Sequence, residues 1–269
     1  MQIDLQFHGR HVIVFGGTTG INFGIADAFA RQGASVTVVS RNRENVDRAV
    51  EMLSVHGHPA ASACADVRDF DSVGLALAES VTRFGPVDVL VSGAAGNFLC
   101  SANRMSPNGF KSVVDIDLVG TFHVLRQAHA HLRKPGAAVI NITAPQSSIA
   151  MRYQAHACAA KAGVDQLTRV LALEWGADGI RVNAISPGPI DGTEGVRRLM
   201  AQDEAEHERA KGAVPLQRLG TLDDVANLAL FLASPYASYV SGALIPCDGG
   251  GALDSVKPAL ESAGRQAGA

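Results

Sequence analysis

The sequence of 269 residues is 47% hydrophobic and 18% charged, a composition that excludes a disordered chain and supports one large buried core. A formal net charge of −3 without a long basic stripe gives no reason to expect nucleic acid as a partner. No segment has the ~18 consecutive apolar residues of a membrane span, and the N-terminus lacks a signal-peptide pattern, so we expect no membrane partner and a cytoplasmic protein.

The periodicity along the chain predicts an α/β fold. Strands are expected at His11–Phe15, Ser35–Ser40, Ala60–Ala65, Val87–Gly93, Ala137–Thr143, Arg181–Ser186 and Ala243–Cys247. The helices between them are expected to include Ile21–Gln32, Asn108–Leu132, Ala155–Trp175 and Leu222–Ala233. Strands that alternate with helices are typical of a single doubly wound parallel sheet of the Rossmann type, which binds ligands beyond the carboxyl ends of its strands.

Nothing in the sequence divides this chain, so we predict one domain over residues 1–269. The polar, helix-prone stretch Gly192–Gly212 is expected to form a helical lid over the substrate, and residues 255–269 a frayed tail. The four cysteines are widely spaced without a C-x-x-C pair, so we expect reduced thiols and no metal site.

A glycine-rich turn follows the first predicted strand, with the sequence Gly16-Gly17-Thr18-Thr19-Gly20. Glycines allow the backbone to bend tightly there, so that amide groups at the start of the next helix face a diphosphate. A glycine cluster by itself is weak support, but its position between a buried strand and a helix near the N-terminus predicts dinucleotide binding. Contacts are expected from Gly16, Thr18, Gly20 and Ile21.

The end of the second predicted strand indicates which dinucleotide is bound. The strand is followed by Ser40-Arg41-Asn42-Arg43, with no carboxylate to accept hydrogen bonds from an adenosine ribose. A guanidinium suits a 2′-phosphate instead. Arg41 therefore favours NADP(H) as the cofactor.

The motifs together resemble the short-chain dehydrogenase/reductase family over nearly the whole chain. The glycine-rich turn, Asn183 within Arg181–Ile185, and Pro187–Ile190 all fit the family frame. The segments Ala94–Cys100, Asp115–Asp117, His156–Lys161 and Pro187–Gly195 are similar to those of peroxisomal-type 2,4-dienoyl-CoA reductases. This resemblance implies a nicotinamide-dependent reductase that acts on an acyl-CoA-type substrate.

The chain departs from the family pattern at several positions. Lys161 is present, but the tyrosine expected four residues earlier is Ala157, and the family's serine corresponds to Ala144. The glycine-rich pattern has Phe15 for its threonine and Asn22 for its last glycine. The family's Asn-Asn-Ala-Gly is replaced by Ser92-Gly93-Ala94-Ala95. The hydroxyl groups that usually donate the proton in this family are therefore missing. The peroxisomal-type enzymes also lack the tyrosine, so its absence here is consistent with the resemblance to them.

The resemblance implies roles for the residues that remain. Lys161 is expected to orient the nicotinamide ribose and to act in catalysis, and Asp117 to position a water or donate a proton. Further cofactor contacts are expected from Asp66, Val67, Ala94, Lys161, Pro187, Gly188 and Ile190. Substrate contacts are expected from Asn97, Phe98 and Arg197. Related enzymes pair the predicted helices Asn108–Leu132 and Ala155–Trp175 across subunits, so a homotetramer is expected.

The loss of both hydroxyls favours reduction of a 2,4-dienoyl thioester. Hydride addition to its far carbon spreads negative charge to the thioester oxygen, so oxyanion donors matter more than a strong acid. Two alternatives stay open. The first is a carbonyl or alcohol oxidoreductase of the same family that uses Tyr153 or His156. The second is a non-catalytic NADPH-binding protein.

Overall fold

A single seven-stranded parallel sheet forms the centre of the computed structural model, which describes residues 5–199 and 203–253. The strand order is β3-β2-β1-β4-β5-β6-β7, and every neighbouring pair is parallel. The strands are β1 His11–Phe15, β2 Ser35–Ser40, β3 Ala60–Cys64, β4 Val89–Ser92, β5 Ala138–Ile142, β6 Arg181–Pro187 and β7 Leu244–Cys247. The predicted doubly wound Rossmann-type sheet is confirmed.

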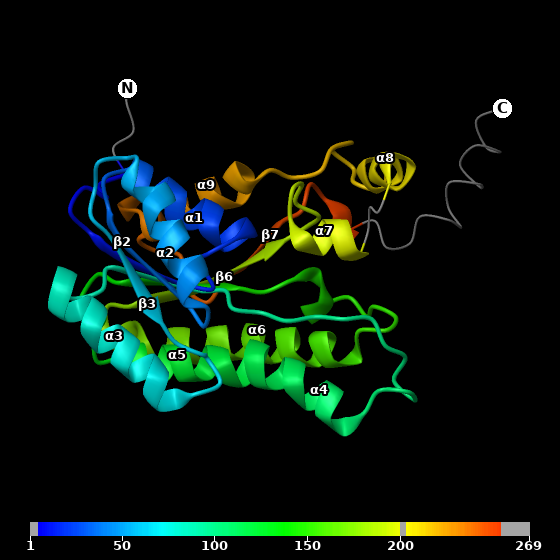
Figure 1. Ribbon diagram of the computed structural model, residues 1–269, viewed down its shortest axis with the longest axis horizontal. Coiled ribbons are helices and arrows are strands. Elements are labelled where there is room, and N and C mark those ends of the chain that lie inside the picture. Colours follow the sequence, from blue (N-terminus) through cyan, green and yellow to red (C-terminus); the bar gives the residue numbers. More distant parts are fainter. Residues whose placement is uncertain (1–4, 200–202, 254–269) are drawn as a thin grey trace.

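Helices cover both faces of this sheet (Figure 1). On one face lie α1 Gly20–Arg31, α2 Arg43–Ser54 and α9 Leu222–Ala233. On the other lie α3 Phe70–Phe84, α4 Pro107–Val114, α5 Gly120–Ala128 and α6 Ala155–Trp175. The predicted stretch 192–212 contains α7 Glu194–Leu199 and α8 Glu204–Gly212, while the predicted tail at 255–269 lies outside the described residues.

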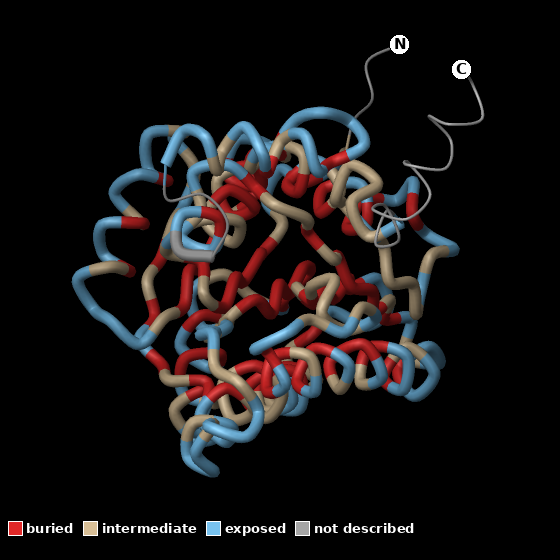
Figure 2. Tube along the Cα trace, turned by 90° about the vertical axis from the view of Figure 1, so that its right-hand side faces the viewer, coloured by how far each residue is buried: buried red, intermediate tan, exposed pale blue. Residues whose placement is uncertain are grey.

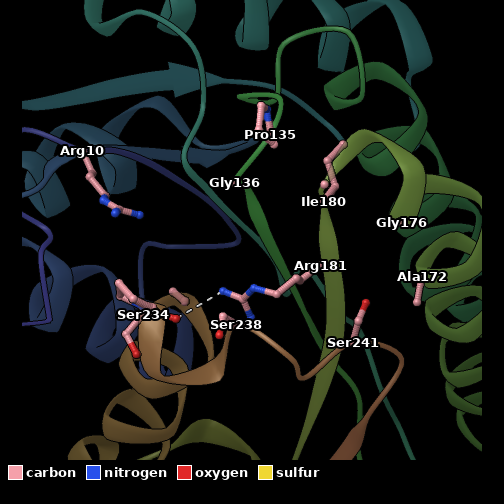
Figure 3. Close-up of a pocket in the computed structure, with 13 residues that line it drawn as sticks. Arg10, Pro135, Gly136, Ala172, Gly176, Ile180, Arg181, Ser234, Ser238 and Ser241 are labelled. Carbon is pink, nitrogen blue, oxygen red and sulfur yellow. Dashed lines mark hydrogen bonds between the residues drawn. The ribbon is translucent and has the colours of Figure 1, made fainter.

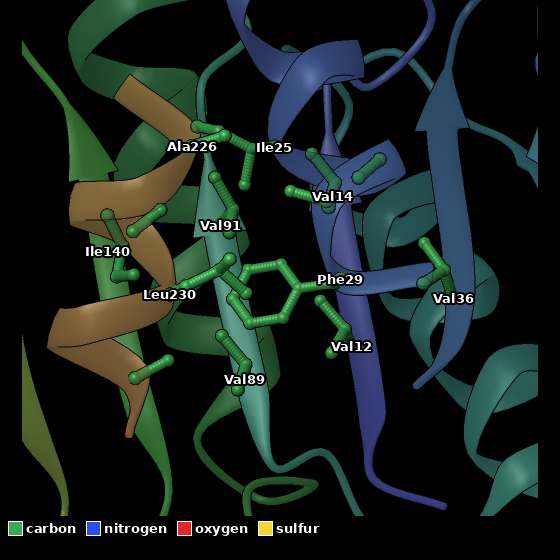
Figure 4. Packing of buried hydrophobic residues seen from close by; sticks show 14 of the residues in the cluster. Val12, Val14, Ile25, Phe29, Val36, Val89, Val91, Ile140, Ala226 and Leu230 are labelled. Atoms are coloured by element: carbon green, nitrogen blue, oxygen red, sulfur yellow. The ribbon is translucent and has the colours of Figure 1, made fainter. Parts of the chain in front are cut away.

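Two apolar cores form because successive side chains of a strand point to opposite faces of the sheet. Val12 and Val14 of β1 belong to the core under α1 and α9, whereas Ile13 and Phe15 belong to the core under α3, α5 and α6. In the first core, Phe29 of α1 packs among valines of the sheet and residues of α9 (Figure 4). Figure 2 shows the buried positions running through the centre and the exposed ones on the outer surfaces of the helices. The sheet is therefore rigidly held from both sides.

The helix predicted at Asn108–Leu132 has a more complex course. A π-helical turn at Asp115–Val119 separates α4 from α5, and α5 ends at Ala128. Beyond α5, the carbonyl of His131 accepts a hydrogen bond from Val87 N, which draws the chain towards the sheet. π-turns of this kind are often found at functional sites. Asp117 lies inside this one.

No helix among the described residues is long and apolar enough to cross a membrane.

Candidate active site

The glycine-rich turn leaves the start of α1 open to an anion. Gly16 and Gly20 have φ angles of 76° and 57°, a left-handed conformation that favours glycine. Thr19, which precedes α1, makes no side-chain capping hydrogen bond, and the first turn of α1 contains no acidic residue. The helix N–H groups and their positive dipole are therefore available to a diphosphate. Thr18 and Ile21, both partly exposed, lie on the same turn.

The carboxyl ends of β2 and β3 bring Arg41 and Asp66 near each other. Arg41 is exposed just beyond β2, and its positive charge acts on Asp66. The pKa of Asp66 is lowered to about 2, chiefly by the hydrogen bond from Arg68, whose Nη2 lies 2.6 Å from Oδ2. Val67 is buried, and a Cβ added to Gly120 would lie 2.6 Å from its Cγ2. Its side chain therefore packs in the protein and its carbonyl contacts His123 Nδ1 at 2.9 Å, which leaves its N–H to face a ligand.

Lys161 and Asp117 form a buried ion pair. Lys161 Nζ lies 3.1 Å from Asp117 Oδ2, and the two residues are 8% and 1% exposed. Asp117 Oδ1 also accepts a 2.7 Å hydrogen bond from Gly96 N, and Lys161 Nζ donates to the carbonyl of Ile142 at 3.2 Å. Both contacts to Asp117 are ones that a carboxylate makes best. The structure thus brings together the two residues for which the sequence predicted catalytic roles.

No hydroxyl stands beside this pair at the family's usual positions. Ala157 is buried one helical turn before Lys161, and Ala144 begins a short 3₁₀ turn after β5. Tyr153 precedes α6 instead of lying on it, has a φ of 66° and is 56% exposed. It is therefore outside the helical register that would place its hydroxyl on the Lys161 face.

His156 is fully buried at the start of α6. Its Nδ1 accepts a 2.8 Å hydrogen bond from Ala157 N, so a neutral ring carries its proton on Nε2. Nε2 is buried and has no partner among the described residues. Phe98 packs against the ring in a T-shaped arrangement, with a centroid distance of 4.4 Å. His156 is therefore shielded by Phe98.

The loop after β4 is held to the start of α6 by hydrogen bonds between Asn97, for which a substrate contact was predicted, and two glutamines for which no role was predicted. Asn97 Nδ2 donates to Gln154 Oε1 at 2.7 Å, and Gln146 Nε2 donates to the same oxygen at 3.1 Å. Gln154 is itself buried. No local pattern in the sequence marks Gln154, because both its burial and its contact with Asn97 depend on the fold. Asn97 and Phe98, both exposed, form this wall of the site.

The carboxyl end of β6 supplies the remaining predicted positions. A Cβ on Gly188 would lie 2.6 Å from Asp248 Cα, so the close approach of the two backbones requires glycine. Ile190 is fully buried, so that only its backbone can face a ligand, and its neighbour in the chain Pro189 accepts a hydrogen bond from Gly220 N. Arg197 is exposed on α7. Pro187 is the last residue of β6 and Ala94 follows β4, so both lie at the same carboxyl edge of the sheet as Gly188 and Ile190.

Two departures from the family pattern, Asn22 and Gly93, meet in space. Asn22 Nδ2 donates a 2.7 Å hydrogen bond to the carbonyl of Gly93, joining α1 to the end of β4. A Cβ added at Gly93 would lie 2.2 Å from Asn22 Oδ1, far closer than the van der Waals contact distance between the two atoms. The asparagine side chain thus occupies the space next to Gly93 that any larger residue there would need. The two departures are therefore in direct contact, and a change at one affects the other.

Comparison with known proteins agrees with this geometry. A family model described as enoyl-(acyl carrier protein) reductase matches residues 16–251. Peroxisomal 2,4-dienoyl-CoA reductases of Pongo abelii and Rattus norvegicus are each 44% identical over 239 residues, or 88% of this chain and 82% of the relative. A Bacillus subtilis protein named "Probable 2,4-dienoyl-CoA reductase" is 40% identical over 90% of this chain and 96% of its own. The mammalian names specify a (3E)-enoyl-CoA product and the bacterial name a (2E)-enoyl-CoA product.

Solved structures show the same fold. A short-chain dehydrogenase from Bacillus anthracis matches with a TM-score of 0.78 and 34% identity, covering 90% of this chain and 96% of its own. A citronellol catabolism dehydrogenase of Pseudomonas aeruginosa matches with a TM-score of 0.81 and 32% identity, covering 94% and 98%.

Proposed function

Because this chain belongs to the short-chain dehydrogenase/reductase family, and is thus an oxidoreductase with a nicotinamide dinucleotide site, we propose that it reduces 2,4-dienoyl-CoA thioesters with NADPH. The observation that carries the proposal is the buried Lys161–Asp117 pair in a site that lacks the tyrosine and serine hydroxyls. Reduction of a conjugated thioester is the family chemistry that tolerates that loss best.

NADPH is favoured over NADH by the charge at the end of β2. Arg41 is exposed there, next to the glycine-rich turn that opens towards a diphosphate. Asp66 already accepts the Arg68 guanidinium, so it does not neutralise Arg41 through a direct ion pair. An adenosine 2′-phosphate would therefore meet a guanidinium that has no carboxylate partner within ion-pair distance among the described residues.

The chain's own residues have distinct parts in the proposed reaction. The glycine-rich turn, Arg41 and Lys161 would hold NADPH, which when bound would supply a hydride for the carbon of the diene farthest from the thioester. The electron pair moves through the conjugated bonds to the thioester oxygen, where the Lys161 cation lowers the energy of the developing negative charge. Asp117 holds a water whose proton goes to the carbon chain, leaving hydroxide that is reprotonated from solvent. Overall one hydride and one proton are added and one double bond is lost.

The substrate is proposed to lie against the loop after β4 and under α7. Phe98 and Asn97 present an apolar face and an amide side by side, which suits an acyl chain joined to a polar thioester. Arg197 on α7 is exposed and can meet a coenzyme A phosphate. In this proposal α7 and α8, the described helices of the predicted lid at 192–212, cover the substrate within a chain that folds as one domain. The protein acts in the cytoplasm.

A homotetramer is proposed because the helices that flank the sheet expose apolar side chains. Phe122 on α5 is 47% exposed, and Leu173 on α6 is 85% exposed. Burial of such side chains across two-fold interfaces is the usual reason for their presence on an outer helix face. Light scattering that shows a monomer at micromolar concentration would refute this assembly.

The experiment that tests the proposed function is NADPH oxidation with a panel of 2,4-dienoyl-CoA, 2-enoyl-CoA and simple ketone substrates. We expect turnover of the dienoyl thioester and little of the ketones. Mass spectrometry and NMR of the product would give the position of its remaining double bond. Turnover of ketones that is lost in Tyr153→Phe would favour a carbonyl reductase instead. Binding of NADPH without turnover of any substrate would favour a non-catalytic protein.

A further inference from the structure

A second concave opening lies at the amino-terminal edge of the sheet, at the opposite end from the candidate active site. It has a volume of about 450 Å³. It lies between the start of β6, the end of α9, the turn that follows α6 and the loop that precedes β7. Arg10 and Arg181 line it together with the serines Ser234, Ser238 and Ser241. No aspartate or glutamate of the described chain is among its lining residues. The opening therefore carries two positive charges without a carboxylate.

The two guanidinium groups point towards each other across this opening (Figure 3). Arg181 donates from Nη1 to the carbonyl of Leu232 at 2.6 Å and from Nη2 to that of Ser234 at 3.4 Å. These bonds fix its position at the end of α9 but do not neutralise its charge. Burial lowers the pKa of Arg181, and the positive charge of Arg10 lowers it further.

Unlike Arg181, Arg10 is not held by hydrogen bonds of its guanidinium group. Its side chain makes no hydrogen bond or ion pair with any residue in the part of the chain that the structure describes, although it is only partly exposed. Two unpaired cations held near each other repel, and an anion placed between them would remove that repulsion. Ser238 and Ser241, both exposed, add hydroxyl donors at the rim.

We propose that this opening is a binding site for a phosphate-group anion, held between the guanidinium groups of Arg10 and Arg181. Guanidinium forks match the tetrahedral oxygens of a phosphate through paired N–H donors, and a doubly charged group balances both arginines. The volume exceeds that of a phosphate alone, so a phosphomonoester fits as well as inorganic phosphate. Because the site is at the far edge of the sheet, its ligand is distinct from the substrate and from the cofactor.

Isothermal titration with inorganic phosphate, at constant ionic strength set with chloride, tests the proposal. We expect saturable binding in the millimolar range or tighter, with sulfate in competition. Arg10→Gln should weaken it by about tenfold or more, whereas Arg10→Lys, which keeps the charge, should lose less. Arg83→Gln, a change at an arginine that lies over the Phe84 ring, is the matched control and should have no effect. Glycerol phosphate that binds more tightly than phosphate would identify a phosphomonoester as the preferred source.

Phosphate could also bind at Arg41, so the titration is repeated with Arg41→Ala. Binding that survives Arg41→Ala and fails in Arg10→Gln supports the site. Binding that is lost in Arg41→Ala, is unchanged in Arg10→Gln, or is not saturable at tens of millimolar overturns it. Arg10 is the residue to change because Arg181 also holds the end of α9 through its hydrogen bonds. Circular dichroism and the dienoyl-CoA reductase assay are the checks that the Arg10 variants are folded.

Discussion

The contact between Asn22 and Gly93 predicts a strong coupling between two mutations. In Gly93→Ala the new Cβ would lie 2.2 Å from Asn22 Oδ1 and 2.5 Å from both Cγ and Nδ2. The whole carboxamide must therefore move, which adds an overpacking cost of about 1–3 kcal/mol. The movement also breaks the 2.7 Å hydrogen bond to the Gly93 carbonyl, at a cost of roughly 0.5–1.5 kcal/mol. We expect Gly93→Ala to lower the unfolding free energy by the sum of these costs, about 1.5–4.5 kcal/mol.

In the background of Asn22→Gly the same alanine should be nearly harmless, because the carboxamide that it would strike is gone. The double variant should be close to Asn22→Gly alone, so the coupling energy should about equal the whole effect of Gly93→Ala, roughly 1.5–4.5 kcal/mol. Urea denaturation at equal protein concentration measures this cycle, since subunit assembly would otherwise contribute. Gly96→Ala, whose Cβ would lie 3.3 Å from the flexible end of Ile116, is the control in the same loop. Additive effects of the two mutations would refute the reasoning.

Three further predictions concern the cofactor, the chemistry and the pH dependence of stability. Arg41→Ala should weaken NADPH binding by about 1.5–3 kcal/mol and NADH binding far less, with Arg43→Ala as the control; fluorescence titration that shows equal losses would defeat the assignment. Lys161→Ala should impair NADPH affinity and turnover together, whereas Asp117→Asn, which keeps an oxygen for Gly96 N, should mainly lower kcat by about 10²–10⁴-fold or somewhat less. Steady-state kinetics and NADPH titration separate these effects, and a severe defect in Tyr153→Phe with Asp117→Asn near wild type would contradict them. Burial lowers the pKa of His11 below its ordinary value of 6.5, so as the pH falls the unfolded chain binds the proton before the folded protein does. The unfolding free energy should therefore fall as the pH drops below about 6.5. His11→Gln should flatten this dependence in urea denaturation between neutral and mildly acidic pH, and an unchanged slope would exclude His11 as its source.

The sequence by itself determined where the helices and strands lie and which catalytic hydroxyl groups are absent. Apolar runs and helical spacing are local properties, and β1, β2, α6 and α9 begin and end at or within one residue of their predicted bounds. The glycine-rich turn could be predicted for the same reason, since a positive φ at Gly16 is a local requirement. The absence of a tyrosine one helical turn before Lys161 also needs only the spacing along one helix.

Tertiary structure decided which of these residues act on one another. Asp117 reaches Lys161 only because a π-turn and α6 pack together, and no periodicity in the sequence distinguishes a π-turn from a continuous helix. Tyr153 is near Lys161 in sequence yet lies outside α6, because the chain adopts a positive φ just before the helix begins. Asn22 and Gly93 look like two separate departures until the parallel pairing of β1 with β4 brings them into contact. Such contacts depend on strand order and packing, which join segments far apart in the chain and leave no trace in local patterns.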